Sequence, residues 1–297
     1  SFLEQKGLEE IDYEIIVVDN GSTDGTRKLL EKLSPKLNAK LRYIFEERKG
    51  VPYARNAGIE HSRGDIIAFT DDDCRFEQNY LCELNNYFCS SQDDIDFIGG
   101  KIKPIWPNKN VPVWIRDDLL GPVALFDKGD KPFVLTAQDP SYTRKIFFGA
   151  NFAFKKEVFE RYGKFNTLQT YAQDTEICLR LLKSGVKGMY CPNLIVYHHI
   201  DPDRMTSAYY YQWFYRRGVF QSGIDDYAFK FYHFLGVPLW IILQAVISFS
   251  QSFLTQNPYD RMKNRCHGFL LFGEMRYRIR TFLKKLNKKN THCAYSN

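Results

Sequence analysis

Several signatures that would identify a function directly are missing from this sequence. The seven cysteines are odd in number and show no Cys-x-x-Cys spacing, which argues against a disulfide framework and against a zinc site. No G-x-x-x-x-G-K-[ST] or G-x-G-x-x-G string occurs, so the usual kinase and dinucleotide-binding interpretations are excluded. The first residues also lack the basic and apolar segments of a signal peptide, and there is no initiator Met. We therefore expect a reducing, cytoplasmic location and a chain that is a fragment.

Net positive charge is absent outside the C-terminal segment. The chain carries +6, but residues 256–297 hold ten Lys/Arg against two acids, or +8, so the preceding residues sum to −2. An enzyme acting on nucleic acid would spread positive charge along its catalytic groove, so we expect no nucleic-acid partner. A neutral body with a basic, aromatic tail fits an anionic membrane surface, and a plain solvated tail is the alternative.

Apolar strands alternate with helical patterns in the first half of the chain. Strands are expected at 15–18, 41–45 and 65–70, with a helix capped by Ser22 or Thr23 after the first strand and a helix at 51–61 after the second. This alternation predicts an α/β fold with a mostly parallel central sheet flanked by helices. Ligands gather at the carboxyl ends of such strands. Further expected elements are helices from Cys74 to about 90, at 156–162 and at 174–184, strands at 97–103, 147–154, 188–191 and 194–198, and an irregular, proline-rich connection over 104–145.

Three consecutive aspartates, Asp71, Asp72 and Asp73, follow the third expected strand. Carboxylates this close repel each other unless a cation neutralises them, and a hard divalent cation such as Mg²⁺ or Mn²⁺ prefers oxygen ligands. Asp71 and Asp73 point to the same side of an extended segment and form a D-x-D pair. A second such pair, Asp94 and Asp96, precedes a strand instead of following one, so we set it aside.

The cluster from Asp19 to Asp24 also lies at a strand end. Helix capping by Ser22, with Asp24 near the helix N-terminus, accounts for part of it. Capping does not account for Asp19, which we expect to accept hydrogen bonds from a nucleobase.

Six strings occur in an order typical of one family, and they cover about residues 10 to 205. The strings are VVDNGSTDGT at 17–26, KGVPYARNAGI at 49–59, AFTDDDC at 68–74, GANFAF at 149–154, QDTEICLRL at 173–181 and VYHH at 196–199. In these strings the chain resembles glycosyltransferase family 2, and its later part is similar to membrane-associated bacterial members that build surface or extracellular polysaccharides.

The resemblance implies a GT-A nucleotide-diphospho-sugar transferase fold, a metal-dependent inverting displacement, and a nucleotide-sugar donor whose base is usually uracil. Displacement at a sugar carbon needs a stabilised leaving diphosphate and one base for the acceptor hydroxyl, whereas a retaining glycosidase needs two paired carboxylates. By matching residues, Asp174 would be the general base. Asp19, Ser22, Arg55, Asn56, Asp71 and Asp72 would bind the nucleotide, and Asp73, Asp71 and His198 would hold Mn²⁺ or Mg²⁺.

The sequence departs from the family pattern at two places. Members usually place Glu before the catalytic Asp, where this chain has Gln173. Members also begin with an additional strand that would be central to the sheet, and this chain begins roughly where the helix after that strand would end. We expect the missing first strand to lower stability and nucleotide affinity.

The part after residue 205 changes to long aromatic helices. We expect residues 1–205 to form an N-terminally truncated GT-A domain and 206–297 a helical, membrane-associating extension. Leu235 to Leu254 is apolar but contains Pro238, two glutamines and three serines, which favours an interfacial helix over a membrane span; an ordinary core-packing helix is the alternative. The acceptor would then be a glycan or a lipid-linked sugar at the inner face of the cell membrane.

Two other functions stay open from the sequence. A nucleotidyltransferase shares the fold but gives no reason for the Asp174 helix or the basic tail. An inactive scaffold or partner-binding subunit would keep the fold without catalysis, and Gln173 and the missing strand are its support.

Overall fold

The computed structural model describes residues 1–37, 40–90, 94–169, 171–224 and 233–293. It separates into two compact units. The first contains Ser1–Ile105 and Ala124–His199, and the second contains Trp106–Val123 and Ile200–Asn297. Each unit is described by itself. The expected domain boundary after residue 205 stays a prediction from the sequence.

The first unit begins with a small parallel sheet. Strand β1 (Ile15–Asp19) pairs with β2 (Leu41–Phe45), and helix α1 (Thr26–Leu33) connects them. Helix α2 (Val51–His61) has the predicted bounds and packs against β1, where Gly58 faces a methyl group of Val18. The predicted cap of α1 is wrong, since the helix begins after Gly25 and Asp24 accepts the Thr26 N–H instead. Ser22 lies too far before the helix to cap it.

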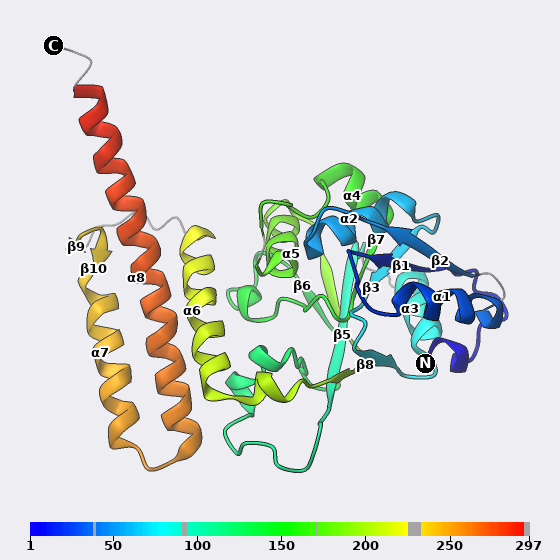
Figure 1. The fold of residues 1–297 in the computed structure, drawn as a ribbon, viewed down its shortest axis with the longest axis horizontal. Helices are drawn as coiled ribbons and strands as arrows, with labels where there is room; N and C mark the ends of the chain where they lie inside the picture. The colour runs from blue at the N-terminus through cyan, green and yellow to red at the C-terminus, as the bar shows by residue number, and fades with distance from the viewer. Residues whose placement is uncertain (38–39, 91–93, 170, 225–232, 294–297) are drawn as a thin grey trace. The chain divides into compact units, whose positions relative to one another are not determined.

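The larger sheet of the first unit has six strands in the order β3-β7-β5-β8-β4, with β6 also paired to β8. Figure 1 shows helices packed around this sheet. The strands are β3 (Ile66–Phe69), β4 (Cys74–Phe76), β5 (Phe97–Ile105), β6 (Phe133–Leu135), β7 (Phe152–Lys155) and β8 (Gly188–His199), and the helices are α3 (Tyr80–Ser90), α4 (Lys156–Tyr162) and α5 (Gln173–Lys183).

The fold class is confirmed as α/β with a central sheet flanked by helices, but the expected mostly parallel order is wrong. Only β1–β2 and β5–β8 are parallel pairs among the described strands of the first unit. Strands β3, β4, β6 and β7 each pair antiparallel. β4 and β7 pair with strands that lie far from them in the sequence, so no direct β-α-β crossover fixes them as parallel neighbours.

Two further elements differ from the expectation. Residues 74–76 form strand β4 instead of the start of a helix, and helix α3 begins only at Tyr80. The two late strands are one continuous strand, β8, which meets β5 with a register shift between Gly100 and Lys101. Such an irregularity bends a strand and frees one residue from the ladder.

Asn151 lies at this irregularity and is fully buried. Its amide donates to the carbonyls of Lys101 (3.0 Å) and Leu194 (2.8 Å), and its Oδ1 accepts from the Tyr80 hydroxyl (3.0 Å). A Cβ at Gly100 would lie 2.1 Å from the Leu194 oxygen, so only glycine permits this approach. The buried amide therefore satisfies backbone groups that the interrupted ladder leaves without partners.

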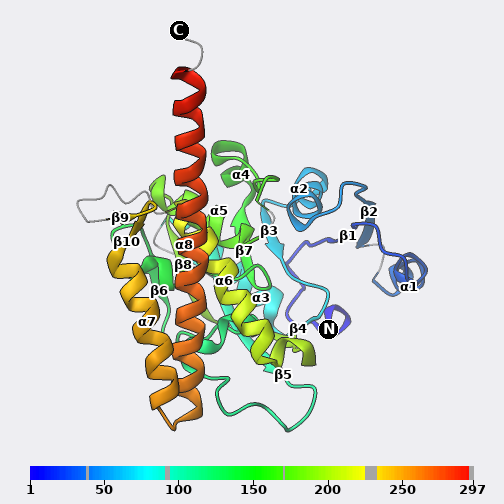
Figure 2. The same cartoon turned by 60° about the vertical axis from the view of Figure 1, so that its left-hand side comes forward.

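The second unit is mainly helical. Helix α8 (Pro258–Cys293) packs against both α6 (Ser207–Ile224) and α7 (Leu239–Leu254), and a short pair of strands, β9 (His233–Phe234) and β10 (Val237–Pro238), precedes α7. Figures 1 and 2 both show α8 between its two neighbours. The loop 106–123 joins this unit, since the Tyr210 hydroxyl donates to the Leu119 carbonyl and Lys263 pairs with Asp118. Within the described ranges, no helix is both long and apolar enough to cross a bilayer.

Candidate active site

Strands β4 and β8 bring Asp73 and His198 together. Asp73 directly precedes β4, whose first residue, Cys74, stands opposite His198 in the antiparallel pair. The Asp73 carbonyl accepts the His199 N–H (2.9 Å), and the Asp73 Oδ2 lies 3.1 Å from Nε2 of His198. The contact therefore depends on a pairing of segments more than a hundred residues apart.

His198 is 1% exposed, and its second ring nitrogen, Nδ1, is buried with no hydrogen-bond partner in the described part of the chain. Buried polar atoms nearly always have a hydrogen-bond partner. The unpartnered Nδ1 of His198, whose other ring nitrogen contacts the Asp73 carboxylate, is therefore an exception that needs an explanation. The donor set of one imidazole and one carboxylate is a partial metal site. It lacks the further ligands that a closed protein cage would supply.

Arg55 comes from α2 and lies against the same group. Its Nη2 is 3.4 Å from Oδ1 of Asp71, and its guanidinium stacks near the rings of Phe152 (5.3 Å) and Phe165 (5.4 Å). The side chain is only 10% exposed, and Nη1 has no hydrogen-bond partner within the described residues. The guanidinium therefore lies against two neighbouring rings, whose centroids are 6.2 Å apart, and this contact restricts its orientation.

Asp174 approaches from the start of α5. Its Oδ2 accepts the N–H of Gly149 (3.1 Å), and its Oδ1 accepts the N–H of Thr175 (2.7 Å). A Cβ at Gly149 would lie 2.2 Å from Nη2 of Arg55, so glycine here lets the guanidinium approach the loop that holds the aspartate. The sequence placed Gly149 in the GANFAF string and gave no sign of this contact.

The pKa of Asp71 shows that these side chains form one electrostatic group. Burial raises this pKa most, Arg55 opposes the rise, the Asp73 and Asp174 carboxylates add to it, and His198 opposes it weakly. Asp71, Asp73, Asp174, Arg55 and His198 therefore act on one another. Five of the residues named from the sequence meet in one place. We call these five residues the acidic group.

The other named residues take different places. Asp19 is buried at the end of β1, where it accepts the Ser22 N–H (2.7 Å) and the Tyr43 hydroxyl (2.8 Å). These bonds, first the Ser22 N–H, hold the pKa of Asp19 below its ordinary value. Asp72 is exposed. A nucleotide role for Asp19, Ser22 and Asp72 stays a prediction.

Asn56 forms hydrogen bonds with the backbone of Phe165. Its amide donates to the Phe165 carbonyl (2.9 Å), and its Oδ1 accepts the Phe165 N–H (3.0 Å). This two-way bond fixes the segment whose ring supports Arg55. Asn20, next to Asp19, was not singled out from the sequence. Its amide likewise joins the ends of β1 and β2 by hydrogen bonds to the backbone of Glu46, Arg48 and Gly50. Both asparagines therefore use their amides on the backbone.

The acidic group fits a divalent cation that shares its coordination with a substrate. The described residues contain no cluster of three or more His, Cys, Asp or Glu that could hold a metal alone. Mg²⁺ in phosphate-transferring sites is commonly bound by one or two carboxylates together with substrate oxygens. Asp73 and His198, which lie 3.1 Å apart, would supply part of such a site, and the assignment of Asp71 to it stays a prediction.

Comparisons with known proteins agree with this arrangement. The sequence profile described as "Glycosyl transferase family 2" matches residues 1–163, which is more than half of the chain. Among curated relatives, glycosyltransferase AglE of Haloferax volcanii is 38% identical over 96 residues, which are 32% of this chain and 31% of AglE. Glucosyl-dolichyl phosphate glucuronosyltransferase of the same organism is 20% identical over 63% of this chain and 59% of its own length. The chain thus spans between a third and three fifths of these relatives.

Solved structures show the fold. The mannosyltransferase PcManGT of Pyrobaculum calidifontis, in complex with GDP-Man and Mn²⁺, matches with a TM-score of 0.57 at 17% identity, covering 93% of this chain and 80% of that one. TarS of S. aureus in complex with UDP matches with a TM-score of 0.52 at 15% identity, covering 93% and 85%. Both show the GT-A arrangement. The matched profile over more than half of the sequence establishes that this chain belongs to glycosyl transferase family 2 and is a glycosyltransferase.

Proposed function

We propose that the protein transfers a sugar with inversion from a nucleoside-diphosphate donor, first of all a UDP-sugar, to an acceptor hydroxyl. The oxygen of the hydroxyl forms a bond to the anomeric carbon, and the bond from that carbon to the diphosphate oxygen breaks. The nucleoside diphosphate leaves with the electron pair, and the hydroxyl proton passes to Asp174. A single base suffices because no covalent intermediate on the protein is needed.

The observation that carries this proposal is the geometry of the acidic group: Arg55 Nη2 lies 3.4 Å from Asp71, and Gly149, which lies against the same nitrogen, donates its N–H to Asp174. One end of the acidic group offers a carboxylate and an imidazole for the diphosphate side. The other end offers a carboxylate that is held by two N–H groups and keeps lone pairs for an acceptor.

On the diphosphate side, Asp73, His198 and Asp71 would hold Mn²⁺ or Mg²⁺. This cation would compensate the negative charge of the diphosphate. A bound cation of this kind supplies Lewis-acid stabilisation of the departing phosphate oxygens. Arg55 would orient Asp71, because its guanidinium packs against the neighbouring rings of Phe152 and Phe165. The neighbour with GDP-Man and Mn²⁺ and the neighbour with UDP support a nucleotide-sugar donor in general.

The acceptor class we propose is a glycan or a lipid-linked sugar of the cell surface, taken up at the inner face of the cell membrane. A curated relative acts on a glucosyl-dolichyl phosphate and another, TarP of Staphylococcus aureus, on poly(ribitol-phosphate), by their names. Peripheral contact with the membrane belongs to this proposal. Its support is the concentration of positive charge after residue 256.

The test measures nucleotide binding first and hydrolysis second. UDP with Mn²⁺ should raise the melting temperature of the protein, since a ligand that binds the folded state stabilises it by mass action. Asp73→Asn should abolish the Mn²⁺-dependent part of that rise and the slow hydrolysis of UDP-sugars. Asp94→Asn is the control, because Asp94 belongs to the other D-x-D pair and contacts Lys155. Equal responses of the two variants would refute the assignment.

The same experiment separates the two alternatives. A nucleotidyltransferase would release pyrophosphate from a nucleoside triphosphate, and UDP-sugar would be its product. An inactive scaffold would show neither hydrolysis nor a difference between Asp73→Asn and Asp94→Asn.

A further inference from the structure

Helix α7 carries an apolar surface that the second unit does not cover. None of its 16 residues is charged. Its buried side consists of Ile241, Ala245, Ser248 and Ser252. Large apolar side chains occupy the remaining surface, and those that are exposed are Leu239, Trp240, Leu243, Val246, Phe253 and Leu254.

The spacing of these residues defines one face. Leu239, Leu243, Val246 and Phe253 follow one another at intervals of four, three and seven, so they lie along one side of the helix. Their exposed fractions run from 51% to 76%. A helix side of this kind is normally buried against another element.

Helix α8 continues the same apolar surface. A groove of about 310 Å³ between α7 and α8 is lined almost wholly by apolar side chains, among them Val246 and Phe253 of α7 and Phe272 of α8. Phe249 forms part of its floor and packs against Phe269 (5.7 Å) and Phe272 (5.3 Å). The exposed side chains of α7 therefore join an aromatic layer that reaches across α8.

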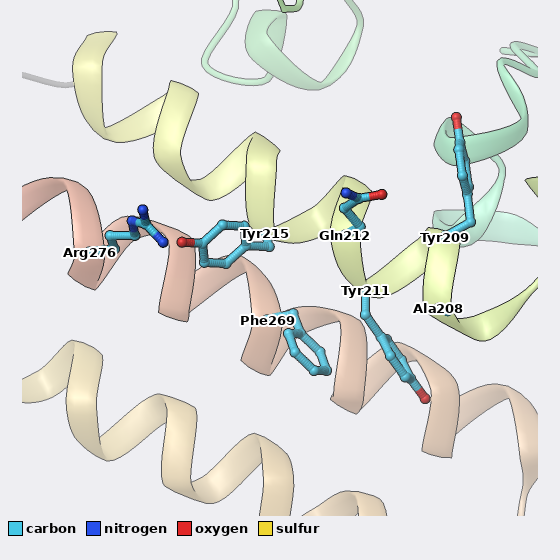
Figure 3. A pocket seen from close by; sticks show the side chains of 7 residues that line it. All are labelled: Ala208, Tyr209, Tyr211, Gln212, Tyr215, Phe269 and Arg276. Atoms are coloured by element: carbon cyan, nitrogen blue, oxygen red, sulfur yellow. The ribbon is translucent and has the colours of Figure 1, made fainter.

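A second hollow, of about 650 Å³, lies on the other side of Phe269, between α6 and α8. Figure 3 shows Tyr211 and Tyr215 of α6 beside Phe269 and Arg276 of α8, with the Tyr215 hydroxyl pointing toward the guanidinium. Tyr211 stacks on Phe269 at 4.6 Å. Because Phe269 lines this hollow and also touches Phe249 of the groove, the two hollows share a wall.

Cations stand at both ends of this surface. The Arg265 guanidinium lies 5.7 Å from the centre of the Phe253 ring, and exposed Arg276 lines the second hollow. Arg265, Phe272 and Arg276 are seven and four residues apart and so share one side of α8. Of the two acids on α8, Glu274 is paired with Arg278. The apolar face is thus flanked by positive charge.

We propose that this face, made of α7, the adjoining side of α8 and the Tyr211–Arg276 hollow, binds the surface of a bilayer that contains anionic phospholipid. The α7 side chains enter the acyl boundary, the tyrosines lie at headgroup level, and Arg276 pairs with a headgroup phosphate. The inference rests on the membrane contact in the proposed function and specifies its surface and its lipid chemistry. An apolar face with flanking arginines matches a bilayer in charge and in hydrophobicity, whereas a soluble anion would match only the arginines.

Vesicle flotation tests the proposal with phosphatidylcholine alone and with added phosphatidylglycerol. The wild-type chain should float better with the mixed vesicles. Leu243→Gln should weaken binding to the mixed vesicles by about tenfold or more, because one buried leucine is lost. Arg276→Gln should weaken it by about fivefold and leave binding to phosphatidylcholine unchanged. Leu29→Gln is the matched control, since Leu29 on α1 is 57% exposed and Leu243 is 59% exposed.

Several outcomes would overturn the inference. Equal flotation of Leu243→Gln and Leu29→Gln would do so, as would release of the protein by free glycerol phosphate. A stable dimer that Leu243→Gln dissociates would assign the face to a second copy of the chain instead. The UDP and Mn²⁺ melting shift, measured on the same samples, keeps the two proposals apart. A shift without flotation refutes the membrane face and the membrane contact but leaves the proposed transfer standing, and flotation without a shift refutes only the proposed transfer.

Discussion

Replacing Asn151 with leucine should destabilise the first unit far more than a change of one side chain of similar size normally does. The Asn151 amide makes three buried hydrogen bonds, to the carbonyls of Lys101 and Leu194 and from the hydroxyl of Tyr80. Leucine has the same branched shape but larger methyl groups, which cannot approach the carbonyl oxygens to 2.8–3.0 Å, so lost hydrogen bonds and overpacking act together. The lost hydrogen bonds lie where the pairing of β5 and β8 shifts its register.

The size of the effect follows from the groups left without partners. Two carbonyls and one hydroxyl remain buried, and each such group costs roughly 1–3 kcal/mol. Neighbouring losses are not fully additive, so we expect the free energy of unfolding to fall by about 3–5 kcal/mol. This is a large part of the roughly 5–15 kcal/mol that is typical of folded domains.

Urea unfolding combined with hydrogen exchange of the β5 and β8 amides measures this change. Asn86→Leu on the exposed side of α3 is the control and should change stability by about 0.5 kcal/mol or less. Adding Tyr80→Phe to Asn151→Leu should recover part of the loss, because the unpaired hydroxyl is removed. If Asn151→Leu unfolds like Asn86→Leu, or if Tyr80→Phe costs as much in both backgrounds, the reasoning fails.

Two more substitutions test the acidic group. Asp174→Asn should lower sugar transfer by roughly 10²- to 10⁴-fold with an unchanged dissociation constant for UDP, because only the base is removed. The control variant, Glu176→Gln in the same turn, should transfer normally. A loss of transfer in both variants would contradict the role of Asp174. Gly149→Ala would place a methyl group 2.2 Å from a nitrogen of Arg55, so we expect about 1–3 kcal/mol of destabilisation and weaker UDP binding. Gly25→Ala has nothing within 4 Å of the new methyl and should melt like the wild type, and equal melting of both alanine variants would show that Arg55 is not held as described.

Much of the first unit could be predicted from local sequence. Helices α2 and α4 have the predicted bounds, because apolar periodicity and the residues that end a helix are local signals. The acidic residues were found for the same reason, since each follows a strand or begins a helix. Four of the family strings also mark the chain segments that meet at Asp71, namely those that contain Arg55, Asp73, Asp174 and His198.

The pairing of the strands could not be predicted in this way. Whether β7 runs antiparallel between β3 and β5 depends on contacts between segments some fifty to ninety residues apart, and the apolar pattern of a buried strand is the same in either direction. The aromatic rings that pack against Arg55 are equally remote in sequence, because Phe152 and Phe165 belong to another part of the chain. The same holds for Gly149, whose importance becomes visible only when the guanidinium lies against it.

The charge of the acidic group explains why one set of residues can serve both sides of a sugar transfer. Asp71, Asp73 and Asp174 are three carboxylates against the single guanidinium of Arg55, which leaves a formal charge of −2 when His198 is neutral. A diphosphate brought to these residues without compensation would be repelled, so we expect nucleotide affinity to depend on a cation held at Asp73 and His198. Arg55 alone does not balance the three carboxylates. On the proposal that Asp174 is the base, the same cation would also offset the negative charge beside it, so we expect both effects to follow from one charge balance.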